Sequence, residues 1–171
     1  MIVSLLALAL FGCSAADVMT APIMVNPKNA ASALGIDVYA QARSMGQAVP
    51  AFRGQETVEV RTYKGTQEVT GPVCNLDSGV YYASFSTPAN VVVPDYGPNS
   101  PAIFVKCEAQ GLLGTTTVDA YNYSAHQRNW GSVGTGVLGA IVIGAVSAAT
   151  RNEQVDEFRY PKISVKMKPT Q

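Results

Sequence analysis

Cys13 is the residue whose surroundings point most directly to a covalent chemistry. It follows an apolar run over residues 2–10, with Leu10 three positions before it and Gly12 directly before it. An apolar run of this length is too short to cross a bilayer and is typical of a cleaved targeting segment. The pattern predicts a bacterial lipoprotein signal peptide at residues 1–12, with lipid attached to Cys13.

The same pattern predicts where the protein resides. A lipid on Cys13 anchors the mature chain in the bacterial cell envelope, and Ser14 after the cysteine fits an outer-membrane lipoprotein facing the periplasm. No Lys or Arg precedes the apolar run. Ordinary secretion, with cleavage after Ala15 or Ala16, is therefore the alternative.

Cys74 and Cys107 are the two cysteines that remain once Cys13 carries lipid. In an oxidising compartment such a pair is expected to form a disulfide. The bridge is predicted to join two non-neighbouring parts of the sheet. A redox-active or metal-binding pair is the alternative, but the chain has no Cys-x-x-Cys and a single histidine.

Catalytic and metal-binding patterns are weak in this sequence. His126 is the single histidine, with Ser124 and Asp119 nearby, and no Gly-x-Ser-x-Gly motif is present. Residues 122–129 read as a polar loop, in which a lone histidine is expected to be solvated. The carboxylates are scattered and form no calcium-binding motif. We therefore predict no enzyme activity, no metal and no cofactor.

Aromatic residues offer a possible ligand or interface surface. Tyr81, Tyr82 and Phe85 lie close together in a β-prone stretch and could bind a small ligand or glycan, although alternating aromatics on a strand also serve the core and cross-strand pairing. Trp130 could be an interfacial anchor of the kind found at membrane boundaries, or a core residue.

The elements that must position these residues are mostly short strands. Alternation and β-prone composition predict strands at residues 58–61, 80–85, 90–93, 103–108, 115–121 and 163–167. Gly- and Pro-containing turns separate them. Residues 29–45 favour a short N-terminal helix, since Leu34, Val38 and Ala42 form one apolar stripe, although a strand also suits this segment. The predicted fold is mainly β, a small antiparallel β-sandwich.

Residues 129–150 carry no charge and interrupt the strand pattern before the last strand. A ridge of small residues repeats every four positions in this Gly/Ala-rich segment, at Gly136, Ala140, Gly144 and Ala148. On a helix such a ridge allows close helix packing. The segment is interpreted either as a membrane-inserting or oligomerising glycine-zipper helix, or as a Gly-rich insertion that packs on the sheet.

The charge composition argues against nucleic acid as a partner. The chain has 12 basic and 12 acidic residues. It contains no basic run, so the sequence predicts no nucleic-acid binding and no polybasic membrane patch.

Three stretches in the middle of the chain form a recognisable pattern: residues 71–76, the Thr-Pro turn and Val strand at 86–94, and the strand at 103–111. With this pattern, the middle of the chain resembles the PEGA-like β domains of bacterial surface proteins. With its cysteines, Gly-rich segment, Val155-Asp156 and Tyr160-Pro161, the chain is similar to an uncharacterised group of proteobacterial lipoproteins. The resemblance implies an envelope location and carries no catalytic residues.

The predicted organisation is a signal peptide (1–12), a lipidated tether (13–28) and one disulfide-linked PEGA-like β domain (29–171) that includes segment 129–150. We expect a non-catalytic envelope lipoprotein that acts as a structural or adaptor module. Its expected partners are the membrane, through the lipid, and an envelope protein or a second copy. A membrane-inserting glycine-zipper oligomer and a small-ligand or glycan binder are the alternatives.

Overall fold

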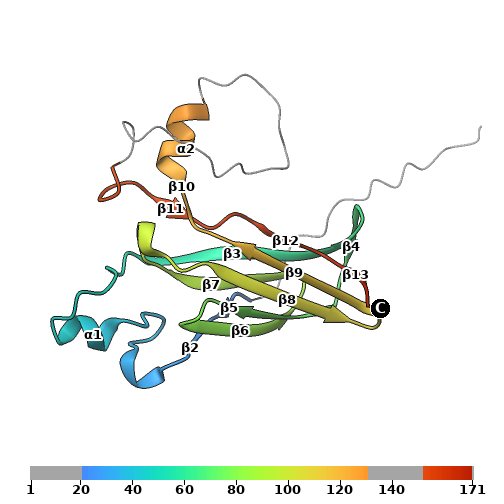
Figure 1. The fold of residues 1–171 in the computed structure, drawn as a ribbon, viewed down its shortest axis with the longest axis horizontal. Helices are drawn as coiled ribbons and strands as arrows, with labels where there is room; N and C mark the ends of the chain where they lie inside the picture. Colours follow the sequence, from blue (N-terminus) through green and yellow to red (C-terminus); the bar gives the residue numbers. More distant parts are fainter. Residues whose placement is uncertain (1–20, 131–151, 171) are drawn as a thin grey trace, which may run out of the picture.

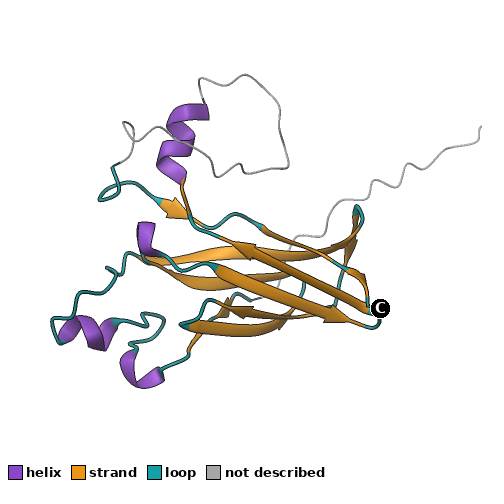
Figure 2. Cartoon of the chain, viewed as in Figure 1, coloured by secondary structure: helices purple, strands orange, loops and turns teal. Residues whose placement is uncertain are grey.

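The structure, a computed structural model, describes residues 21–130 and 152–170 (Figure 1). Strands dominate this part of the chain and its helices are short (Figure 2). The prediction of a mainly β chain that forms a small sandwich is confirmed. Two main sheets, called sheet A and sheet B below, form the sandwich, and a ribbon of β10 (Tyr121–Asn122) and β11 (Phe158–Arg159) lies at one end of it.

Sheet A is centred on β3, which is long enough to pair with all the other strands of the sheet except β1. Its order is β1-β7-β3-β12, and β4 also pairs with β3. The strands are β1 (Ile23–Met24), β7 (Ala89–Asp95), β3 (Gly54–Lys64), β12 (Ile163–Lys166) and β4 (Gln67–Val69).

Sheet B is antiparallel throughout, with the order β13-β9-β8-β5-β6-β2. Its strands are β13 (Lys168–Pro169), β9 (Leu112–Val118), β8 (Ile103–Ala109), β5 (Val73–Asp77), β6 (Tyr81–Ser86) and β2 (Asn26–Pro27).

The core lies between the sheets and follows from the alternation of side chains along each strand. In β6, Tyr81, Ala83 and Phe85 are buried while the residues between them are exposed, and β8 and β12 show the same pattern. The two inner faces form one hydrophobic cluster. The strands predicted at residues 80–85, 103–108 and 163–167 are therefore present, and the alternating faces predicted for residues 163–167 are confirmed.

Two extended segments join the sheets at their edges. Val25 separates β1 in sheet A from β2 in sheet B, and Met167 separates β12 in sheet A from β13 in sheet B. Both residues are buried in the core. Each donates its backbone N–H to a strand of sheet A, to Val92 O at 3.1 Å and to Tyr63 O at 2.7 Å. The N- and C-terminal parts of the described chain therefore close the two long sides of the sandwich.

Strands β1 and β2 lie within residues 13–28, which the sequence analysis assigns to the tether. Ile23 and Met24 pair with β7, and Asn26 and Pro27 pair with β6. The folded domain therefore begins before residue 29. Each of these strands has only two residues, which is too short for an alternating pattern to reveal it.

Two strand pairs within this largely antiparallel sandwich are parallel, β1 with β7 and β12 with β3. The path of the chain explains the second pair. β9 carries the chain to the end of the sandwich where β10 and β11 pair, and β12 then starts from that end, as β3 does (Figure 1).

The predicted helix over residues 29–45 is two separate short helices. These are a 3-10 helix, η1 (Ala30–Ser32), and α1 (Ala40–Ser44). A turn between them pairs Leu34 with Asp37 and holds Gly35 at φ 59°. That left-handed conformation interrupts a helix. The remaining helices are η2 (Gly97–Asn99), also 3-10, and α2 (Tyr123–Trp130).

Candidate functional site

The Cys74–Cys107 disulfide is present, and it is a cross-strand bridge rather than a link between distant strands. The cysteines face each other directly in β5 and β8, with Cα atoms 4.0 Å apart, and both are fully buried. After β6 the chain crosses into sheet A as β7 and returns to sheet B as β8, on the free side of β5. The prediction of non-neighbouring strands is therefore wrong, because this crossover makes β5 and β8 neighbours.

The aromatic residues of β6 divide between the two faces of sheet B. Tyr81 is fully buried, with its hydroxyl 3.4 Å from that of Tyr160, so it is a core residue and not an interface residue. Tyr82 is 47% exposed on the outer face. Phe104 of β8 is exposed on the same face, and Asp77 of β5 lies between them in register. A period of two places neighbouring residues on opposite faces.

His126 lies on helix α2 and not in the polar loop that the sequence predicts. Its ring is exposed, and its centroid lies 5.8 Å from that of Tyr121. The nearby Ser124 hydroxyl accepts the backbone N–H of Glu157 at 3.0 Å. Trp130 is the last residue of α2. Within residues 21–130 and 152–170, no group of three His, Cys, Asp or Glu side chains could hold a metal ion.

Cys13 and the ridge of Gly136, Ala140, Gly144 and Ala148 lie outside the described residues. Of the helices that the structure describes, none is both long and apolar enough to cross a membrane.

The two chain segments that flank residues 131–151 are held together by the buried Asp156. Its carboxylate accepts hydrogen bonds from Asn122 Nδ2 at 2.7 Å, from Arg128 Nη2 at 2.9 Å and from the backbone N–H of Asn152 at 2.8 Å. The Asn122 hydrogen bond, followed by those of Asn152 and Arg128, outweighs burial and lowers the pKa of Asp156. A single helical crossing of a membrane by residues 129–150 would place these flanks on opposite sides, and so it would require this cluster to separate.

Glu56 is a half-buried carboxylate near the same end. Its oxygens accept the backbone N–H of Tyr160 at 3.1 and 3.3 Å. Burial raises the pKa of Glu56 from 4.5 to about 7, and the Tyr160 hydrogen bond offsets only part of this. The Tyr160 hydroxyl donates to the carbonyl of Pro101, so Glu56 and Tyr160 together tie β3 to the loop before β8.

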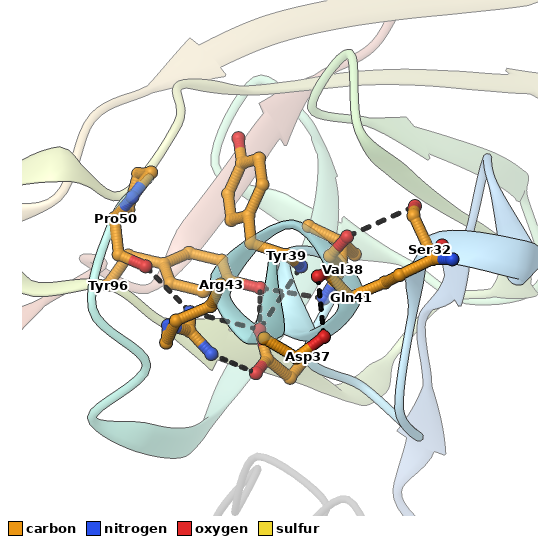
Figure 3. Close-up of polar contacts among 9 residues, drawn as sticks. Ser32, Asp37, Val38, Tyr39, Gln41, Arg43, Pro50 and Tyr96 are labelled. Atoms are coloured by element: carbon orange, nitrogen blue, oxygen red, sulfur yellow. Dashed lines mark hydrogen bonds and ion pairs between the residues drawn. The ribbon is translucent and has the colours of Figure 1, made fainter. Parts of the chain in front are cut away.

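A buried polar cluster positions the long segment between β2 and β3 (Figure 3). The Tyr96 hydroxyl accepts the Val38 N–H at 2.9 Å and donates to Asp37 Oδ1 at 3.2 Å. Arg43 reaches from α1 to Asp37 Oδ2 at 2.6 Å and to the Pro50 carbonyl at 2.7 Å. These contacts fix a segment that holds little regular structure.

Elements α1 and β11 lie at the same end of the sandwich (Figure 1). Large apolar side chains in the segments next to these elements are exposed, and we call this part of the molecule the apolar end. Arg53 joins the segment before β3 to the segment before β11, because it donates hydrogen bonds to the carbonyls of Glu153 and Asp156 at 2.6 and 3.1 Å. The exposed residues, from 39% to 78% exposed, are Leu34, Met45, Phe52 and Val155.

A groove of about 720 Å³ runs along the opposite part of the molecule, between β9, β12 and β13. Gly114 allows the close approach of β9 and β12, because a Cβ there would lie 2.7 Å from the backbone oxygen of Lys166. Among the described residues, no carboxylate lines the groove. Its polar lining consists of hydroxyl and ammonium groups from Thr115, Thr116, Ser164, Thr170, Lys166 and Lys168.

Comparison with known proteins gives no match to a protein-family model, a curated protein or a solved structure.

Proposed function

We propose that this chain is a non-catalytic lipoprotein of the bacterial cell envelope, with a PEGA-like β domain, that acts as a structural or adaptor module through protein–protein contacts. The buried Cys74–Cys107 disulfide carries this proposal. Such bonds form and persist in oxidising compartments, among them the bacterial periplasm. Because this bond engages two of the three cysteines, Cys13 is left as the acceptor for lipid.

The apolar end is the contact surface of the adaptor. Its four exposed apolar side chains come from three separate segments that the Tyr96 and Arg53 hydrogen bonds hold in place. Exposed apolar surface is characteristic of protein–protein interaction sites when it forms a contiguous patch. The partner is another envelope protein or a second copy of this chain.

Substitution at the apolar end tests the adaptor role. Leu34→Asp with Met45→Asp is expected to abolish the cross-linked product that the wild-type protein forms in intact cells, because a charge in an apolar interface is costly. Thr117→Asp, at an exposed position of β9, is the matched control and should leave it unchanged. A product that persists in the double variant, or that is absent from the wild type, contradicts the proposal.

The anchor has a separate test. Mass spectrometry of the N-terminal peptide from native membranes should show a lipid on Cys13, and Cys13→Ser should abolish it. An unmodified thiol at Cys13 in mature wild-type protein contradicts the lipoprotein assignment while leaving the adaptor test intact.

Glycan binding is a second candidate, favoured by the outer face of sheet B. Tyr82 and Phe104 are exposed there on either side of β5, two strand spacings or about 9.6 Å apart. Two aromatic rings at this separation could stack on sugar rings of one chain. Tyr82→Ala should then reduce co-sedimentation with isolated peptidoglycan, and an unchanged bound fraction contradicts this candidate.

A further inference from the structure

Three lysines at one end of the sandwich make no ion pair with any residue that the structure describes. Lys28, Lys106 and Lys162 are paired with Asp77, Glu108 and Glu59. The other lysines in the described ranges are Lys64, Lys166 and Lys168. Lys166 and Lys168 line the groove, and both are exposed.

Strand register brings Lys64 to the same end. Tyr63 pairs with Lys166 across β3 and β12, and Lys64 follows as the last residue of β3. β13, which contains Lys168, follows β12 after one residue. Because the three lysines come from two distant parts of the chain, the sequence shows no basic run although the fold creates a basic end.

Strand β1, near the start of the described chain, begins on the side of sheet A that lies toward this basic end. β1 is parallel to β7, and Ala89 at the start of β7 pairs with Val60 of β3. Ile23, the first residue of β1, is therefore the residue of β1 nearer to the end of β3 at Lys64. Residues 13–20 span at most about 28 Å. An anchor at Cys13 would therefore connect the domain to the membrane from the side of the basic end.

We propose that the groove between β9, β12 and β13 binds the phosphate-bearing headgroups of anionic lipids in the membrane that anchors the chain. This inference rests on the lipoprotein assignment above. It deepens that assignment, because it orients the domain with its basic end toward the lipid and its apolar end toward a protein partner.

Charge complementarity favours an anionic lipid headgroup. Lys166 and Lys168 supply ammonium donors, and Thr115, Ser164 and Thr170 supply hydroxyl donors. Ammonium and hydroxyl groups without a competing carboxylate suit phosphate oxygens. Lysines close to an anionic leaflet are each attracted to it. The anchor supplies such a surface at high local concentration.

Lysine reactivity tests the proposal on the natively acylated full protein, reconstituted in phosphatidylcholine vesicles with or without phosphatidylglycerol. An amine-acetylating reagent is applied, and mass spectrometry follows each lysine. We expect Lys166 and Lys168 to react about fivefold more slowly when phosphatidylglycerol is present. Lys28 and Lys162, which have ion pairs elsewhere, serve as internal controls and should not change.

Each other outcome has a defined meaning. Equal reactivity in the two vesicle types overturns the proposal, whether the lysines are protected in both or in neither. If inorganic phosphate protects these lysines in phosphatidylcholine vesicles, the ligand is a soluble phosphate, and the proposal of a lipid headgroup is overturned. The double variant Lys166→Gln and Lys168→Gln should also lose the phosphatidylglycerol-dependent protection of Lys64. Circular dichroism checks that the variant remains folded.

Failure of the lipoprotein assignment can be distinguished from failure of the groove proposal. If the N-terminal peptide shows Cys13 without lipid, the same protein is added to preformed vesicles of both compositions and the lysine reactivity is measured again. Protection that depends on phosphatidylglycerol then supports the groove as a headgroup site without an anchor, and its absence overturns the groove proposal as well.

Discussion

Replacing Glu56 with Gln should stabilise this protein at alkaline pH and leave its stability at acid pH nearly unchanged. The substitution removes the charge while keeping an oxygen that can accept the Tyr160 N–H, whose distances to the carboxylate oxygens are 3.1 and 3.3 Å. Burial is the largest cause of the raised pKa of Glu56, and the nearby Asp95 and Glu157 add to it.

Proton linkage determines whether stability rises or falls with pH. The pKa of Glu56 is 4.5 as a free side chain and about 7 in the folded protein. Between these values the folded state holds a proton that the unfolded state has lost, so stability falls as the pH rises from 4.5 to about 7 and is constant above that. The full difference corresponds to about 3 kcal/mol. Solvent contact of this half-buried carboxylate reduces the expected effect to about 1–2 kcal/mol.

Urea unfolding of the wild type and of Glu56→Gln at about pH 4 and about pH 8 measures this effect. The free energies of unfolding should agree at the lower pH, and the variant should be the more stable at the higher pH. A variant that is less stable at the higher pH, or a difference that does not depend on pH, would refute the reasoning.

Glu59 on the same strand is the matched control, because its pKa shifts in the opposite direction. Burial raises the pKa of Glu59, but hydrogen bonds from Lys162 and Arg61 outweigh this and hold it below its ordinary value. Its stabilising contribution is present above that ordinary pKa and is lost as the pH falls through the folded value. Glu59→Gln should therefore lower stability at about pH 8, and the loss should shrink toward acid pH.

Three further variants test the disulfide, a buried hydrogen bond and the packing of the sandwich. Cys74→Ala with Cys107→Ala opens a loop of sequence separation 33 and should lower the free energy of unfolding in urea by about 3–4 kcal/mol; an unchanged midpoint would mean that the bond is absent in solution. Tyr96→Phe leaves the Val38 N–H without its acceptor and should cost about 1–3 kcal/mol in thermal unfolding, so an unaltered melting temperature would contradict the described hydrogen bond. Gly114→Ala places a methyl group 2.7 Å from a backbone oxygen of β12 and should cost about 1–3 kcal/mol by the same assay, whereas a neutral effect would show that β9 and β12 lie further apart.

Side-chain alternation determines much of this fold locally. The strands predicted at residues 80–85, 103–108 and 163–167 are present, and the alternating faces predicted for 163–167 are observed, because the period of two is a property of extended backbone itself. The cysteine pair was also predictable, because its chemistry depends on compartment and on residue count. Local signals therefore carried the fold class and the cross-link.

Which strands become neighbours depends on the path of the whole chain. The crossover of β7 into sheet A placed Cys74 opposite Cys107, and the parallel pairing of β12 with β3 brought Lys166 to the same end of the sheet as Lys64. The buried position of Tyr81 beside the exposed Tyr82 depended on which face of β6 meets sheet A. The groove, the basic end and the apolar end are products of tertiary structure, since each combines residues far apart in sequence whose proximity no local pattern encodes.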